Sequence, residues 1–131
     1  DNTKYYNDEM GEKLFRKFVS FEELIDPSQL PAIKIFSNDI ELRFSRPGCD
    51  SPKRRVNIDP GYLELSKLIL ASTKNFSHRI YLNDGIYGEV TLIFRGNEFT
   101  YLDWTYPDYK TSFAKTFLMD VRNKYNLQLK V

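Results

Sequence analysis

Hydrophobic residues at helical spacing follow a helix-start signal in the first third of the chain. Asp26 before Pro27 is typical of an N-cap and a first helical residue. Apolar positions then recur three or four residues apart, at Leu30, Ile33, Phe36 and Ile40. The pattern predicts a helix over residues 26–40, in which Pro31 is awkward.

A hairpin is the alternative for this region. It would turn at Ser37-Asn38-Asp39 and carry apolar residues at Ile33, Ile35, Ile40, Leu42 and Phe44. We favour the helix. Upstream, residues 13–25 mix apolar and charged side chains, and the alternation over residues 18–21 allows a strand.

The most apolar stretch follows a second helix-start signal. After a short predicted strand at Arg55–Ile58, Asp59 and Pro60 supply an N-cap and a first-turn proline for a helix over about Gly61–Ser72. Little polar surface remains in this helix, because its apolar residues are Leu63, Leu65, Leu68, Ile69, Leu70 and Ala71. We therefore expect it to be buried on more than one side.

Three antiparallel strands are predicted over residues 78–104, joined by the turn signals Asn83-Asp84-Gly85 and Gly96-Asn97. A three-residue first loop, with Gly85 left-handed, places Arg79 opposite Glu89 on one face. The other face then carries Ile80, Leu82, Ile86, Val90 and Leu92. A two-residue turn would move Glu89 among the apolar groups without a partner, so the longer loop is preferred.

Pro107 opens a predicted C-terminal helix that should pack on the sheet. Its apolar stripe comprises Phe113, Phe117, Leu118, Val121 and Tyr125. Together the elements predict an α+β fold, with an antiparallel sheet made of the meander 78–104 and one or two further strands, packed against two or three helices. At 131 residues the chain fits a single domain, 1–131, with a loop at Ser45–Lys53.

Composition narrows the class of protein. Apolar residues make up 41% and charged residues 28%, as in an ordinary globular protein. No apolar run approaches the roughly 20 residues that span a bilayer, and no signal peptide begins the chain, so we predict a cytoplasmic protein without a membrane partner. A lone Cys49 and a single histidine form neither a disulfide nor a zinc-ligand set. Between Arg43 and Arg79, eight basic and three acidic residues make one basic segment.

Two long segments carry a resemblance to a known family. They are RRVNIDPGYLELSKLILASTKNFSHRIYLNDGIYGEVTL, from Arg54 to Leu92, and WTYPDY, from Trp104 to Tyr109. Also similar are EMGEKLFRKFVSFEELIDP, from Glu9 to Pro27, and the IK and SND elements near Ile33 and Ser37. The chain resembles an uncharacterised prokaryotic family, domain of unknown function 4416.

The resemblance implies two further things. Some members are labelled GTP-binding proteins, so it implies GTP binding, and members have a further strand and helix before the position of Asp1, so it implies an N-terminally shortened chain. The residues contain no Gly-x-x-x-x-Gly-Lys-Ser/Thr run to surround phosphates. Ser72-Thr73-Lys74-Asn75 and Asn123-Lys124-Tyr125-Asn126 lack the Asp that would hold guanine. GTP would therefore bind here without the usual GTPase apparatus.

His78 is the candidate general acid or base, with Lys74 and Arg79 near it in sequence to hold an anion. A lone histidine at a strand start is more often structural. Asp59 could be a metal ligand or base, but its role as an N-cap is sufficient. A hydrolase that pairs His78 with Asp59 or Glu89 is the third hypothesis for function.

The leading hypothesis is a domain that binds a phosphate-bearing ligand, a nucleotide or RNA, through a basic and aromatic sheet face. The residues predicted to bind it are Arg54, Arg55, Lys74, Arg79, Tyr81, Tyr87, Glu89 and Trp104. The arginines at 54 and 55 can reach Arg79 only if the strand of Arg55 lies beside the strand of His78. The alternative is a non-catalytic protein-interaction module; the sequence identifies neither a reaction nor a cofactor.

Overall fold

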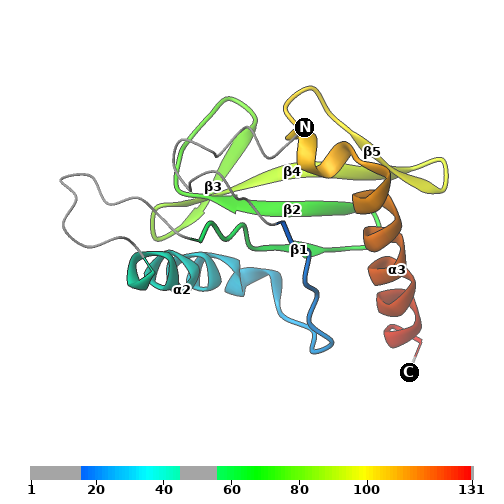
Figure 1. The fold of residues 1–131 in the computed structure, drawn as a ribbon, viewed down its shortest axis with the longest axis horizontal. Helices are drawn as coiled ribbons and strands as arrows, with labels where there is room; N and C mark the ends of the chain where they lie inside the picture. Colours follow the sequence, from blue (N-terminus) through cyan, green and yellow to red (C-terminus); the bar gives the residue numbers. More distant parts are fainter. Residues whose placement is uncertain (1–15, 45–55, 131) are drawn as a thin grey trace.

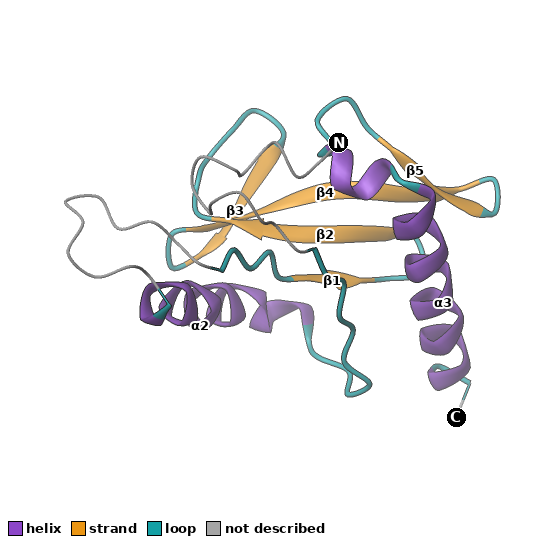
Figure 2. Cartoon of the chain, in the orientation of Figure 1, coloured by secondary structure: helices purple, strands orange, loops and turns teal. Residues whose placement is uncertain are grey.

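The computed structural model describes residues 16–44 and 56–130. In these residues an antiparallel five-stranded sheet packs against two α-helices, which confirms the predicted α+β class (Figures 1 and 2). The helices are α2, Leu30–Arg43, and α3, Ser112–Gln128. The strands are β1, Gly61–Leu63; β2, Lys67–Ser72; β3, Arg79–Asn83; β4, Ile86–Arg95; and β5, Glu98–Tyr101. Figure 1 shows α2 running along the strand direction and α3 running across it.

The long strand β4 is the centre of the sheet. The strand order is β1-β2-β4-β3, and β5 also pairs with β4. One edge of β4 pairs with β2. Its first half also pairs with β3 and its second half with β5, so β3 and β5 lie end to end along the other edge. The meander predicted over 78–104 is therefore confirmed.

The helix predicted over Gly61–Ser72 is wrong, because these residues form the β1–β2 hairpin. The Glu64 N–H donates to the Lys67 carbonyl at 2.8 Å and closes the turn. Helices cover both faces of β2, so its apolar run is as continuous as that of a buried helix. Asp59 consequently caps no helix. The predicted strand at Arg55–Ile58 is also wrong for residues 56–58, which form a loop, while Arg55 lies outside the described residues.

Gly61 allows the close approach of β1 to β2. A Cβ atom at this position would lie 2.3 Å from the carbonyl oxygen of Ile69 and 2.7 Å from a methyl carbon of Leu70. Any other residue would force the strands to shift. The glycine that follows Asp59-Pro60 thus marks a strand contact.

The predicted pairing of Arg79 with Glu89 is confirmed, but by a different turn. Asp84 and Gly85 form a two-residue turn with φ of 51° and 78°, as a type I′ hairpin requires. An irregularity between Tyr81 and Asn83 then restores the predicted register. The three-residue loop is wrong, because this bulge takes up the extra residue.

A second irregularity lies in β4, opposite the Leu68–Ile69 step of β2. Val90 pairs with Ile69 and Leu92 with Leu68, so Thr91 is the extra residue between them. Leu92 therefore faces away from Val90. The prediction that both share a face with Ile86 is confirmed for Val90 and wrong for Leu92. On one face α2 covers a core of Leu30, Ile69, Ala71 and Ile86. On the other, Leu68, Leu70, Leu92, Phe99, Tyr109 and Leu118 form the core under α3.

The helix predicted after Asp26 is confirmed, and the hairpin alternative is wrong. The Asp26 side chain accepts from the Ser28 N–H at 2.9 Å, and the Gln29 side chain accepts from the Asp26 N–H at 2.8 Å. A 3-10 turn over Pro27–Gln29 leads into α2. Pro31 lies in the first turn of α2, where its missing N–H costs no helical hydrogen bond. No strand forms over the described residues 16–25.

The buried face that α2 turns to the sheet shares only Leu30 with the predicted apolar stripe. Its buried residues are Leu30, Pro31, Lys34, Ser37 and Glu41. Phe36 of the predicted stripe is 62% exposed. Hydrogen bonds explain this choice, because the Ile58 N–H donates to Glu41 Oε2 at 2.7 Å and Lys34 Nζ donates to the Ile58 carbonyl at 3.4 Å. The polar face of α2 therefore fixes the loop before β1.

The C-terminal helix packs on the sheet as predicted, with Ala114 and Leu118 buried. A 3-10 turn over Pro107–Lys110 precedes it, and the Thr111 hydroxyl caps it by accepting from the Ala114 N–H at 3.1 Å. Phe113 of the predicted stripe stays 67% exposed. No helix in the described part of the chain is long and apolar enough to cross a membrane.

Candidate functional site

A cleft of about 290 Å³ lies where the loop before β1, the end of β2 and the turn before α3 meet. Its charged lining residues are Lys34, Asp59, Lys74, Arg79, Glu89 and Asp108. Asn57, Ser72, Thr73, Tyr106 and Tyr109 add polar groups. Only Leu70 and Ala71 of the lining residues have purely apolar side chains, so a ligand in this cleft would meet mainly polar groups.

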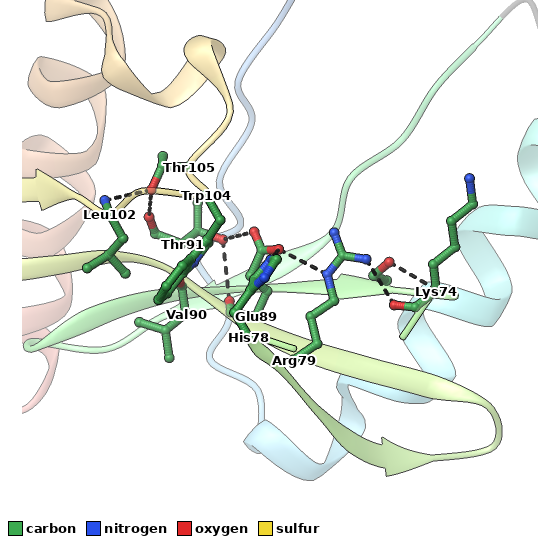
Figure 3. Close-up of polar contacts among 10 residues, drawn as sticks. Lys74, His78, Arg79, Glu89, Val90, Thr91, Leu102, Trp104 and Thr105 are labelled. Atoms are coloured by element: carbon green, nitrogen blue, oxygen red, sulfur yellow. Dashed lines mark hydrogen bonds and ion pairs between the residues drawn. The ribbon is translucent and has the colours of Figure 1, made fainter. Parts of the chain in front are cut away.

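Glu89 lies at the floor of this cleft and is only 3% exposed. Its Oε1 accepts from Arg79 Nε at 3.0 Å and lies 2.8 Å from His78 Nε2, while the Thr91 hydroxyl lies 3.3 Å from Oε2. A buried carboxylate requires such partners, since burying an unpaired charge costs several kcal/mol. Glu89 thus holds two basic side chains in place (Figure 3).

Arg79 reaches from β3 across Glu89 to the end of β2. Its Nη1 donates to the Lys74 carbonyl at 2.9 Å, and the Lys74 N–H donates to the Ser72 hydroxyl at 3.1 Å. Figure 3 shows the guanidinium between Glu89 and Lys74. No described residue accepts from the remaining nitrogen, Nη2, so a fixed donor is left for a ligand.

Lys34 enters the same cleft from α2 and is 8% exposed. Its one hydrogen bond among the described residues is the long contact of 3.4 Å with the Ile58 carbonyl. None of the carboxylates in the described ranges lies within ion-pair distance of its ammonium group. A buried ammonium with so few partners is poorly compensated by the protein itself.

Sequence reasoning missed Lys34 because the apolar neighbours Ile33 and Ile35 dominate the pattern. A signal was present, since Lys34, Ser37 and Glu41 share one helix face at spacings of three and four. That polar stripe indicated a face bonded to backbone. Its burial could be seen only once the loop at Ile58 was placed beside it.

Two carboxylates, Asp59 and Asp108, also line the cleft. The Asp108 side chain is 12% exposed and forms an ion pair with Arg16. Burial raises the pKa of Asp108, Arg16 opposes this rise, and the nearby Asp59 carboxylate adds to it. Asp59 Oδ2 accepts from Asn57 Nδ2 at 3.3 Å. Sequence reasoning considered Asp59 only as a cap, ligand or base, and it did not consider Asp108.

His78 and Trp104 contact Glu89 and β4 but are not among the residues lining the cleft. Their rings stack with centroids 4.8 Å apart and planes 16° apart. Trp104 Nε1 donates to the Val90 carbonyl at 2.7 Å, in the gap between β3 and β5. His78 could exchange a proton with Glu89, but its stacked position equally fits a structural role.

The other predicted site residues separate from this group. Tyr81 and Tyr87 pack edge to face, with centroids 5.4 Å apart, near the β3–β4 turn. Arg54 and Arg55 lie outside the described residues. The strand that was to bring Arg54 or Arg55 beside Arg79 does not form over residues 56–58, so their convergence stays an untested prediction. The structure therefore brings together Lys74, Arg79 and Glu89, with His78 and Trp104 beside them.

Metal binding has no support in the described ranges, where no group of three or more His, Cys, Asp or Glu side chains could hold an ion. Comparison with known proteins matches the chain to a family. Residues 1–125 match the model of a family described as "Domain of unknown function (DUF4416)". No curated protein and no solved structure matches the chain. The matched residues include the five strands, α2, most of α3 and every charged residue of the cleft.

Proposed function

The chain belongs to the family described as domain of unknown function DUF4416, and for this domain we propose the binding of a small phosphate-bearing ligand in the cleft between α2, β2 and the turn before α3. Lys34 carries the proposal. A phosphate oxygen would give its buried ammonium group the charged acceptor that the described residues do not provide.

Arg79 and Lys74 are the supporting groups. The guanidinium of Arg79 is already held by Glu89 and the Lys74 carbonyl, so it loses little conformational freedom when it binds an anion. The Lys74 side chain is exposed at the same cleft and can add its charge. In this proposal Lys34, Lys74 and Arg79 form the anion site that was predicted from Arg54 or Arg55 together with Arg79.

The dimensions of the cleft favour a small ligand over RNA. Ligand pockets usually measure roughly 300–1,000 Å³, and this cleft, at about 290 Å³, is at the lower limit. The stacking residues proposed for RNA, Tyr81, Tyr87 and Trp104, do not line it. His78 does not line it either, so the proposed function is binding and assigns no reaction.

Calorimetric titration with inorganic phosphate at low salt tests the proposal, with Lys34→Met as the variant. Methionine keeps the apolar stem without the charge, so the fold should be retained. We expect affinity to fall about tenfold or more, because a charged hydrogen bond contributes roughly 1.5–3 kcal/mol. The matched control is Lys124→Met on the exposed side of α3. Equal affinity in both variants, or no binding by the unmodified chain, would overturn the proposal.

The alternative function, a non-catalytic protein-interaction module, is favoured by a different surface. The outward side of α2 exposes Ile35, Phe36 and Leu42 by 44%, 62% and 66%. Light scattering of the chain and of Phe36→Ser would show whether this side joins two copies. A dimer that dissociates in the variant, in a chain that binds no phosphate, would favour the interaction module.

A further inference from the structure

We infer that the ligand of this cleft is a small zwitterion, whose phosphate group binds Lys34 and Arg79 and whose ammonium group binds Asp59 and Asp108. The inference rests on the proposed function and adds the chemistry of the second half of the ligand. It starts from the charges of both signs that line the cleft.

Some of these charges are neutralised within the protein. Arg79 forms an ion pair with Glu89 at 3.0 Å, and Asp108 forms one with Arg16. Lys34, Lys74 and Asp59 form none with any described residue. The cleft therefore presents uncompensated charges of both signs, two cations and one carboxylate, to whatever enters it.

Lys34 and Asp59 are close in the fold yet do not pair. The Lys34 ammonium contacts the carbonyl of Ile58, the residue next to Asp59, but no oxygen of the Asp59 carboxylate lies within 4.0 Å of it. Both side chains line the cleft. A ligand with opposite charges at its two ends would complement both of them at once.

The two carboxylates, Asp59 and Asp108, require that the second group of the ligand be positively charged. Asp59 and Asp108 are near enough that the charge of Asp59 raises the pKa of Asp108, so the two ionised groups repel each other. An ammonium group placed beside them would relieve this repulsion. A polyanion such as a nucleoside triphosphate would itself be repelled by both carboxylates, unless a cation came with it.

The test compares O-phosphoethanolamine with ethyl phosphate, which lacks the ammonium group. In calorimetric titrations at pH 7 we expect phosphoethanolamine to bind about fivefold more tightly, as one partly exposed ion pair allows. Asp59→Asn should abolish this preference and leave the affinity for ethyl phosphate equal or higher. The matched control, Asp120→Asn on the exposed side of α3, should keep the preference.

The outcomes separate this inference from the proposed function. Equal affinity of the two compounds for the unmodified chain, or a preference that survives Asp59→Asn, overturns the zwitterion and leaves phosphate binding intact. No binding of either compound overturns both. Melting temperatures of the variants show whether they remain folded, and because Asp59 lies in an exposed loop position we expect no large shift.

Discussion

The surroundings of Asp108 disfavour its ionised form and raise its pKa. Burial is the main cause of its raised pKa, and the nearby Asp59 adds to it despite the ion pair with Arg16. The folded chain therefore holds a proton on this carboxyl more tightly than the unfolded chain does. The stabilisation of the folded state by the protonated Asp108 is complete at pH values below its ordinary pKa of 3.8. It is lost as the pH rises through the raised pKa of the folded chain.

Asp108→Asn should remove this pH dependence, because asparagine does not titrate. We expect the free energy of unfolding of the unmodified chain, minus that of the variant, to decrease as the pH rises from about 3.8 and then to level off. Urea denaturation of both proteins between pH 3 and pH 7 measures the difference. A difference that instead grows with pH would mean that the ion pair with Arg16 outweighs burial.

At the scale of elements, side chains fill the gap between β3 and β5. The Thr105 hydroxyl donates to the Thr91 carbonyl at 2.6 Å. Trp104 Nε1 donates to the Val90 carbonyl at 2.7 Å. The edge of β4 is thereby satisfied where no strand pairs with it. At the same point, the bulge at Thr91 reverses the sheet face to which the following side chains of β4 point.

Thr105→Val tests the role of this hydroxyl. Valine has almost the same shape but leaves the buried Thr91 carbonyl without its donor, so we expect unfolding to become easier by about 1–3 kcal/mol. Thr105→Ser keeps the hydroxyl and should cost clearly less. Urea denaturation measures both, and equal losses would show that the methyl group of Thr105 contributes as much to stability as its hydroxyl.

The sequence predicted those elements whose signals are local. Asp26-Pro27 marks a helix start correctly, whereas Asp59-Pro60 presents the same signal before a strand. The difference between the two segments lies in Gly61, which allows β1 to approach Ile69 of β2 closely. This contact exists only when β1 pairs with β2. The bulge at Thr91 and the burial of Lys34 likewise depend on neighbours distant in sequence. Arg79 and Glu89 could be predicted because the register of one hairpin pairs them, and Lys74 because it lies close to Arg79 in the sequence.

At the scale of the whole molecule, the two cores share strands β2 and β4. Leu68 and Leu70 face α3, while Ile69 and Ala71 face α2. Neither helix can detach from the sheet without exposing residues of a strand that also packs against the other helix. We therefore expect the described elements to unfold as one unit, in keeping with the predicted single domain.

Urea unfolding followed by two probes measures this cooperativity. Fluorescence reports on Trp104, the single tryptophan of the chain, at the edge of the sheet. Far-UV circular dichroism reports largely on α2 and α3. The two transitions should share one midpoint, and a helical transition at lower urea would show that one helix detaches first.

The strand order bears on how fast the chain folds. Among the described strands, β1–β2, β3–β4 and β4–β5 are hairpins of consecutive strands, and only β2 and β4 pair across an intervening strand. Hairpins close within about 1–10 μs, because their loops are short. The joining of β2 to β4 brings together segments further apart in sequence, so its loop-closure entropy belongs to the barrier that limits the folding rate.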